Sequence, residues 1–248
     1  NPPYAESGSG VARGDTNKLG VEKTRINAWM REINLGYASK ELFAQFLVRI
    51  RHELPKARLA MFSTLKYVNA PNFEKFRTVW KAKFLDGFVV HSRVFDGLKS
   101  DFPIGFLIWD TSRKVPISET PVGAFDRFGA LVEEKLYVAR PTKTLLNLWV
   151  NKTRPNGGPA LPLSNALKVS TNPRPKRQLL GALGFLYASN NDLQHSATET
   201  LITSSIYTGG NGGGDYLTSD NLWQAAIAFA VRRLIKPNWL NDRDQCLQ

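Results

Sequence analysis

RLAMFST, residues 58–64, is a short apolar run with a polar residue at each end. A run of this length that lacks helical spacing predicts a buried β-strand. Two similar runs follow, DGFVVH at residues 86–91 and IGFLIW at residues 104–109, and a loop separates them. All three are continuously hydrophobic rather than alternating, which is typical of strands that are covered on both faces.

Helical patterns lie on either side of the first strand. Ser39 is the candidate N-cap of a helix whose apolar residues recur at helical spacing over residues 42–50, and Pro55 closes that segment. Asn69-Ala70-Pro71 is interpreted as the opening of a second helix. Its aromatic residues are Phe73, Phe76, Trp80 and Phe84. The order helix–strand–helix–strand–strand predicts part of a three-layer α/β sheet.

The pattern weakens after about residue 112, and a further helix is predicted near the end of the chain. Proline, glycine and asparagine punctuate residues 151–175, so we place a domain boundary between residues 118 and 119. The last helix is expected from Ser219 or Asp220 to Pro237. The sequence therefore predicts one α/β unit over residues 1–118 and a mixed extension over residues 119–248.

The chain is strongly basic, with a formal net charge of +12 over 248 residues. Such a charge often accompanies a polyanionic partner, and nucleic acid is favoured over an anionic membrane surface. The alternative is a solvated basic surface with no such partner. The sequence contains no stretch of about 18 apolar residues, so no membrane span is predicted. The single cysteine, Cys246, cannot form an internal disulfide, so a cytoplasmic location is expected.

The chemistry-bearing motif is Asn1-Pro2-Pro3-Tyr4, at the start of the chain. No initiator methionine precedes it, and we expect the chain to have been cut from a longer polypeptide. The Asn1 side-chain oxygen and the Pro2 carbonyl can accept both hydrogens of an aromatic amine, which frees the nitrogen lone pair for attack. The two prolines restrict the turn, and Tyr4 can stack on a base rotated out of a duplex. The alternative is a proline-stiffened turn without chemistry.

This motif resembles the hallmark of the N6-adenine DNA methyltransferases, which ends the fourth strand of a class I (Rossmann-like) methyltransferase fold. The resemblance continues through the strand that ends at Trp109. It implies that this chain holds the last three strands of that fold with their helices. It also implies that Phe95, with Phe102 as the second candidate, helps to form the pocket for a flipped adenine. The alternative for both residues is an ordinary place in the core.

The resemblance implies S-adenosylmethionine as the cofactor. In the common chain order of the family, the glycine-rich turn and the acidic residue that bind it precede the hallmark, so most of that site is expected upstream of Asn1. The one glycine cluster, at residues 208–215, has no acidic residue before it and is interpreted as a loop ahead of the last helix. We therefore expect the chain alone to bind the cofactor weakly and to be inactive.

A basic stretch between Lys135 and Asn191 contains no acidic residue. It could follow the phosphates of double-stranded DNA, and a solvated surface is the alternative. The candidate contacts are Arg154, Arg174, Lys176 and Arg177. Asp126, Glu133 and Lys135 only faintly suggest a nuclease site, and the three histidines lack zinc-ligand spacing, so no metal site is predicted.

These features predict a fragment of a site-specific DNA adenine-N6 methyltransferase of the restriction-modification type. A fused or separate restriction nuclease is a possible partner. Two alternatives stay open, namely an RNA or protein-glutamine N-methyltransferase and a catalytically silent DNA-binding fragment.

Overall fold

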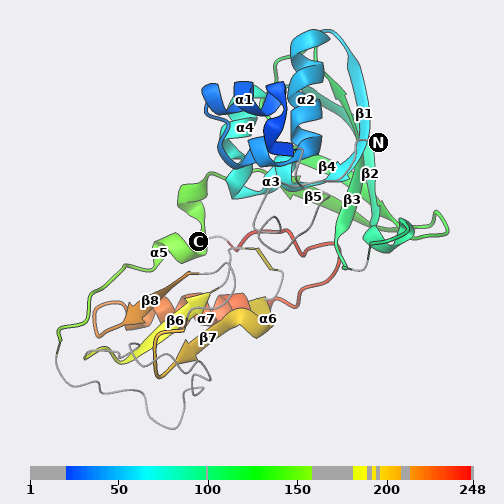
Figure 1. Ribbon diagram of the computed structural model, residues 1–248. Coiled ribbons are helices and arrows are strands. Elements are labelled where there is room, and N and C mark those ends of the chain that lie inside the picture. Colours follow the sequence, from blue (N-terminus) through cyan, green and yellow to red (C-terminus); the bar gives the residue numbers. More distant parts are fainter. Residues whose placement is uncertain are drawn as a thin grey trace. The chain divides into compact units, whose positions relative to one another are not determined.

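The computed structural model divides into two compact units, Asn1–Thr142 and Lys143–Gln248 (Figure 1). Within them it describes residues 21–98, 100–157, 181–188, 192–193, 196–207 and 213–246. Each unit has its own sheet.

The first unit contains a mixed five-stranded sheet in the order β1-β3-β2-β4-β5. Its strands are β1 (Arg58–Thr64), β2 (Lys83–His91), β3 (Pro103–Asp110), β4 (Glu119–Phe125) and β5 (Leu131–Val138). β3 lies antiparallel between β1 and β2, β4 runs parallel to β2, and β5 is antiparallel to β4. The three strands expected from their apolar runs are confirmed, and the chain is an α/β protein.

β4 and β5 extend the sheet past the expected domain boundary. β4 pairs with β2 over Gly123–Phe125, and β5 pairs with β4 along almost its whole length. The boundary at residues 118/119 therefore falls just before strands that belong to the first sheet. The compact units divide instead after Thr142, because this strand pairing ties residues 119–138 to the first unit.

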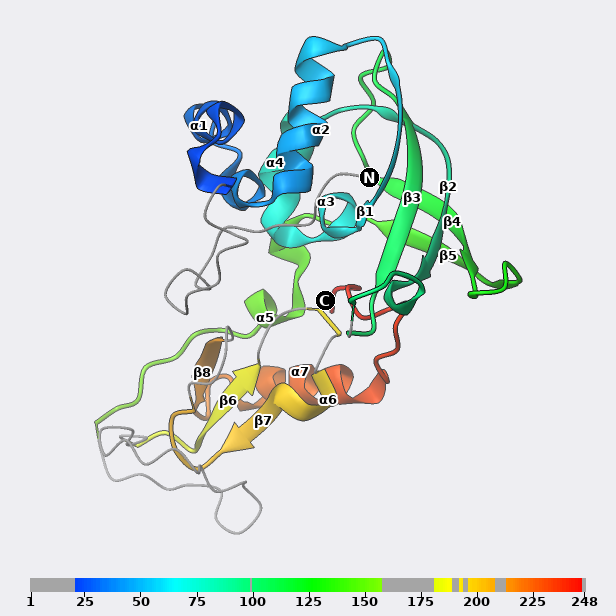
Figure 2. The same cartoon turned by 45° about the vertical axis from the view of Figure 1, so that its right-hand side comes forward.

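Helices cover one face of this sheet, and Figure 2 shows α1 to α4 on the same side of it. The helical segments are η3 (Val21–Lys23), α1 (Arg25–Glu32), η4 (Gly36–Lys40), α2 (Leu42–Glu53), α3 (Lys66–Asn69), η5 (Pro71–Phe73), α4 (Glu74–Val79) and η6 (Ser92–Val94). The helix expected from Ser39 begins later, because Ser39 lies inside η4 and its hydroxyl donates to the Gly36 carbonyl. Glu41 is the N-cap residue instead.

The second expected helix is shorter. It begins at Pro71 as expected, with η5 followed directly by α4, but Trp80 follows α4 and Phe84 lies on β2. Pro71 suits the start of a helix, because the first helical residue does not need the N–H that proline lacks. The result places several aromatic rings against the sheet rather than along one helix.

An aromatic core fills the space between these helices and the sheet. Trp109 of β3 is 1% exposed, and its ring centroid lies 5.3 Å from that of Trp80 and 6.0 Å from that of Tyr67. The Trp109 indole N–H donates to the Tyr67 hydroxyl at 2.9 Å, and the Trp80 indole N–H donates to the Leu47 carbonyl at 3.1 Å. Both buried donors are thereby satisfied, as the burial of polar groups requires.

The opposite face of the sheet differs from the three-layer expectation. No described helix of the first unit covers it, and its residues include Phe62, Phe88, Phe106 and Phe125, all half-buried. Phenylalanine side chains on this face, together with the buried apolar side chains on the helical face, produce the continuous hydrophobicity of β1 to β3. The apolar runs therefore predicted the strands correctly but not the number of layers.

The second unit has a three-stranded antiparallel sheet in the order β7-β6-β8. Its strands are β6 (Gly184–Ala188), β7 (Thr200–Thr203) and β8 (Gly213–Leu217), and its helices are α5 (Leu146–Trp149), α6 (Ser196–Glu199) and α7 (Leu222–Leu234). A short turn, η7 (Thr142–Thr144), precedes α5. Ala225 and Ala228 of α7 pack in a core with Leu186 of β6 and Leu217 of β8.

α7 confirms the expected last helix, although it begins and ends two to three residues inside the expected limits. Asn221 fixes its start. The Asn221 side chain accepts the Thr218 N–H at 3.0 Å and donates to the carbonyls of Asn151 and Tyr216, at 2.8 Å each. These bonds connect the beginning of α7 to the end of β8 and to the segment after α5.

Candidate functional site

The carboxyl ends of three parallel strands meet at one edge of the first sheet. β1 and β2 are each antiparallel to β3 and so run in the same direction, and β4 is parallel to β2. In α/β sheets, ligands commonly bind beyond the carboxyl ends of the strands. Phe95 follows β2 at this edge, Arg127 follows β4, and Phe102 precedes β3. The structure therefore brings both sequence-predicted phenylalanines to the edge where a site is expected.

The loop between β2 and β3 is held by a network centred on Ser92, which is fully buried. The Ser92 N–H donates to the Phe102 carbonyl at 2.9 Å, and its hydroxyl accepts the Phe102 N–H at 3.3 Å. The same hydroxyl donates to the Ser100 carbonyl. The Arg93 guanidinium pairs with the Asp101 carboxylate at 2.7 Å across the loop. These bonds fix the loop on both sides of Phe95.

Phe95 joins a group of half-buried rings that we call the phenylalanine cluster. Its members are Phe62, Phe88, Phe95, Phe106 and Phe125. The centroid of the Phe62 ring lies 5.4 Å from that of Phe95 and 4.7 Å from that of Phe106. The centroid of the Phe88 ring lies 5.5 Å from that of Phe106 and 6.0 Å from that of Phe125. The cluster thus runs across four strands from the carboxyl edge. Rings in such a surface can stack on or pack against a nucleic-acid base.

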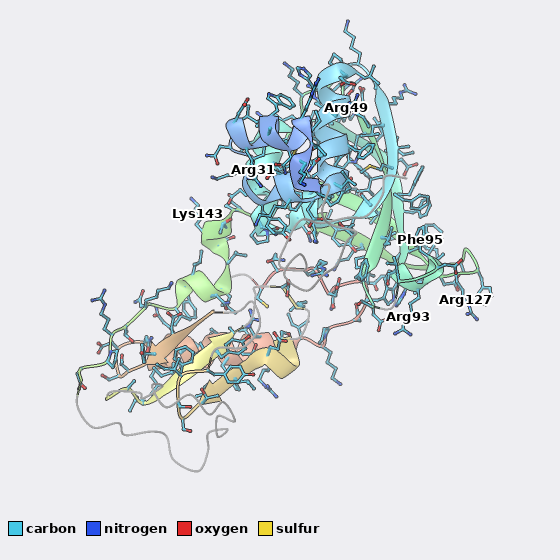
Figure 3. All side chains as sticks on the ribbon, viewed as in Figure 1. Arg31, Arg49, Arg93, Phe95, Arg127 and Lys143 are labelled. Carbon is cyan, nitrogen blue, oxygen red and sulfur yellow. The ribbon has the colours of Figure 1, made fainter. Side chains whose placement is uncertain are left out.

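Two arginines stand at the same end of the unit as Phe95. Figure 3 shows Arg93 and Arg127 near Phe95, whereas Arg31 and Arg49 lie over the helices. Arg127 occupies the β4–β5 turn, with its guanidinium 4.7 Å from the centre of the Phe128 ring. The Phe128 side chain is 81% exposed. Exposed cations beside exposed rings suit a ligand that has both phosphates and bases.

The β4–β5 turn is built by Asp126, so this residue has a structural role. Its carboxylate accepts the N–H groups of Phe128 at 2.8 Å and of Ala130 at 2.9 Å. Glu133 and Lys135 lie on β5. Within the described residues, no group of histidine, cysteine, aspartate or glutamate side chains could hold a metal ion. In the same part of the chain, no helix combines the length and apolar character of a membrane span.

The remaining sequence-predicted residues fall into two groups. The motif Asn1-Pro2-Pro3-Tyr4 and the candidate contacts Arg174, Lys176 and Arg177 lie outside the described residues. Arg154 is described and exposed, in the second unit. It follows a short anchored segment, since the Asn151 N–H donates to the Gln224 side chain at 3.1 Å and the Thr153 hydroxyl to the Tyr216 carbonyl at 3.1 Å.

The glycine cluster ends in a strand, which explains at least one of its glycines. Gly213, Gly214 and Asp215 belong to β8. A Cβ atom at Gly214 would lie 2.3 Å from the Phe185 ring and 2.5 Å from the Leu186 carbonyl oxygen. Any larger residue would displace that ring or the neighbouring strand. Gly214 therefore serves strand packing; residues 208–212 lie outside the described part of the chain.

Sequence reasoning did not single out Arg93, Arg127 or the other four members of the phenylalanine cluster. Phe62, Phe88 and Phe106 each lie in an apolar run that was predicted as a strand, but only the register in the structure shows that they are paired neighbours. Arg127 carried no usable signal, since the hairpin that positions it was not predicted.

Comparisons of the chain with protein-family models, with curated proteins and with solved structures give no match.

Proposed function

We propose that this chain is the target-binding part of a DNA adenine-N6 methyltransferase and that S-adenosylmethionine binds mainly to a segment upstream of it. The observation that carries the proposal is Phe95, held at the carboxyl edge of the sheet and continuous with the phenylalanine cluster. Together with the Asn1-Pro2-Pro3-Tyr4 motif, it supplies aromatic contacts for a base and hydrogen-bond acceptors for an amine.

The sheet topology supports this proposal. β3 lies antiparallel between the parallel strands β1 and β2, and this mixed sheet with helices is loosely compatible with the Rossmann-like fold that the resemblance implies. Among the described strands, β1 is the edge strand on that side, so its outer backbone groups can pair with a further strand. A cofactor-binding half that added strands next to β1 would extend the sheet.

In the proposed reaction, each residue has a limited role. Asn1 and Pro2 accept the two N–H groups of the adenine amine and orient its lone pair, and Tyr4 stacks on the base. Phe95 bounds the base on another side, while Arg127 contacts a phosphate. S-adenosylmethionine, when bound, would supply the methyl group: an N–CH3 bond would form as its S–CH3 bond breaks, the thioether would leave, and the amine proton would pass to water. Asn1 is neutral, so it positions the amine and does not remove the proton.

The test joins the chain to its upstream cofactor-binding half and measures N6-methyladenine in duplex DNA by mass spectrometry. The joined protein is expected to methylate DNA, and the chain alone is expected neither to methylate DNA nor to bind S-adenosylmethionine appreciably. Phe95→Ala should lower kcat/KM about 10- to 100-fold, the range expected from the loss of one ring–base contact. Tyr4→Ala should lower catalysis strongly with only a modest loss of duplex binding.

Phe46→Ala is the matched control, because Phe46 lies on α2, is 40% exposed and does not belong to the phenylalanine cluster. It should leave activity unchanged. Methylation of RNA, or of a glutamine-containing peptide, in place of DNA would identify one of the alternative methyltransferases. A joined protein that binds DNA and cofactor but methylates none of the three substrates would leave only the silent DNA-binding alternative.

A second prediction concerns the basic stretch. Replacing Arg174, Lys176 and Arg177 together by alanine should reduce the slope of log affinity against log salt for duplex DNA by about 3, since each phosphate contact contributes about 0.9. Filter binding over a salt series measures this slope. Arg154→Ala should reduce the slope by about 1 in the same assay. A slope that is unchanged in all of these variants would mean that the stretch is only a solvated surface.

A further inference from the structure

α7 has an apolar stripe on its outer side. Its inner side, with Ala225, Ala228 and Arg232, is buried against the sheet of the second unit. On the opposite side the residues are Trp223, Ile227, Ala230 and Leu234. Trp223 and Leu234 are each 77% exposed, Ala230 is exposed and Ile227 is half-buried. Two large side chains that are so exposed on one helix are unusual for a surface that has no partner.

The spacing of this stripe is that of a coiled-coil seam. Steps of four, three and four residues separate Trp223, Ile227, Ala230 and Leu234, and they place all four on one line along the helix. Ala226, which is also exposed, lies beside this line. A helix with such a seam packs against another helix when the large and small residues of the two seams alternate.

The seam is complementary to itself when a second copy runs antiparallel. A two-fold axis between Ala228 and Phe229 brings Trp223 opposite the Leu234 of the second copy, and Ile227 opposite its Ala230. Each layer then pairs a larger side chain with a smaller one, so the helices can approach closely. An isologous contact of this type closes as a dimer and leaves no free seam.

The charges at the two ends of α7 favour the same arrangement. Asp220 precedes the helix, whereas Lys236 follows it, and both are exposed. An antiparallel pair places Asp220 of one copy at the helix end that carries Lys236 of the other. It also sets the positive end of each helix dipole beside the negative end of its neighbour. A parallel pair would bring like charges together.

We propose that the second unit forms a homodimer through an antiparallel pair of α7 helices, with Trp223 and Leu234 as the anchoring side chains. One 13-residue helix from each copy makes a small contact. The expected dissociation constant is therefore on the order of 10–100 µM. None of the residues in the proposed adenine site belongs to this dimer contact.

Sedimentation equilibrium of the full chain over a wide concentration range tests this proposal. The wild type should pass from monomer to dimer with the stated affinity. Trp223→Glu and Leu234→Glu should each weaken the dimer at least about tenfold, because a desolvated charge would face an apolar side chain. Leu148→Glu is the matched control; Leu148 lies on α5 of the same unit, is 54% exposed and is not part of the seam. Unchanged circular dichroism would show that each variant still folds.

A charge exchange tests the orientation. Asp220→Lys alone and Lys236→Asp alone should each weaken the dimer about two- to fivefold, and the two together in one chain should restore it. A chain that is monomeric throughout the concentration range would overturn the proposal. So would a dimer that resists both glutamate variants, because its contact would then lie elsewhere. A double variant that stays weak would contradict the antiparallel arrangement.

Discussion

Replacing Trp109 by alanine is expected to lower the free energy of unfolding of the first unit by about 3–5 kcal/mol. Trp109 lies on β3, the strand between β1 and β2, and is 1% exposed. Its ring contacts those of Tyr67, Trp80 and Phe84, with centroids 5.3–6.0 Å away. Removal of the ring leaves a cavity that strand pairing prevents from closing, and the Tyr67 hydroxyl loses its donor.

A loss of this size is a large share of the stability of an ordinary domain, about 5–15 kcal/mol. Urea unfolding of the purified chain measures it, and amide hydrogen exchange of β3 assigns it to the first unit. The control is Phe128→Ala, because Phe128 is 81% exposed and its loss should change stability by no more than about 0.5 kcal/mol. If the two variants were equally stable, Trp109 would not be part of the packed core.

The sequence predicted those strands whose hydrophobic signal is local. β1, β2 and β3 each contain an uninterrupted apolar run, and their limits agree with the structure to within three residues. β4 was missed because Pro121 and Gly123 interrupt it. Pro121 is tolerated since β2 pairs with β4 only from Gly123 onward, so the missing N–H at Pro121 interrupts no bond on that side. β5 was missed because Glu133, Glu134 and Lys135 stand in its middle.

The residues of the candidate site divide in the same way, into those with a local sequence signal and those without one. Phe95 was identified through a resemblance, and the structure places it at the carboxyl edge because it follows β2, a strand that was predicted. Arg127 lies in the β4–β5 turn. This turn reaches the edge only because β4 pairs with β2, a strand that lies far away in the sequence. Contacts that depend on long-range strand pairing have no local signal, so a single sequence could not have revealed them.

The second unit is expected to become more stable as the solution is acidified, and Asp242 is the reason. Asp242 is 3% exposed, and both of its carboxylate oxygens are buried. Burial, aided by Asp192 and Asp244, raises its pKa from the ordinary 3.8 to about 7, although Arg243, with Nε 3.4 Å from one oxygen, acts in the opposite direction. The folded unit therefore holds the neutral acid more readily than the unfolded chain does.

The direction of the pH dependence follows from the difference between the folded and unfolded pKa values of Asp242. Because the folded pKa exceeds the unfolded one, the stabilisation is fully present below about pH 4 and is lost as the pH rises through about 7. A shift of about three pKa units corresponds to about 4 kcal/mol, of which roughly 3 kcal/mol should be lost between about pH 5 and about pH 8. Above pH 7 the fold must instead hold a buried charge whose only described ion pair is with Arg243.

Asp242→Asn replaces the ionisable group by a neutral one of nearly the same shape. This variant should be more stable than the wild type at about pH 8, by about 1–3 kcal/mol, and nearly equal to it at about pH 5. Thermal unfolding at the two pH values measures the difference, and exchange of the β6 amides locates it in the second unit. Asp96→Asn, at an exposed position, should leave the pH dependence unaltered. If Asp242→Asn kept the wild-type pH dependence, the Asp242 carboxyl would have to be solvated in the folded protein rather than buried.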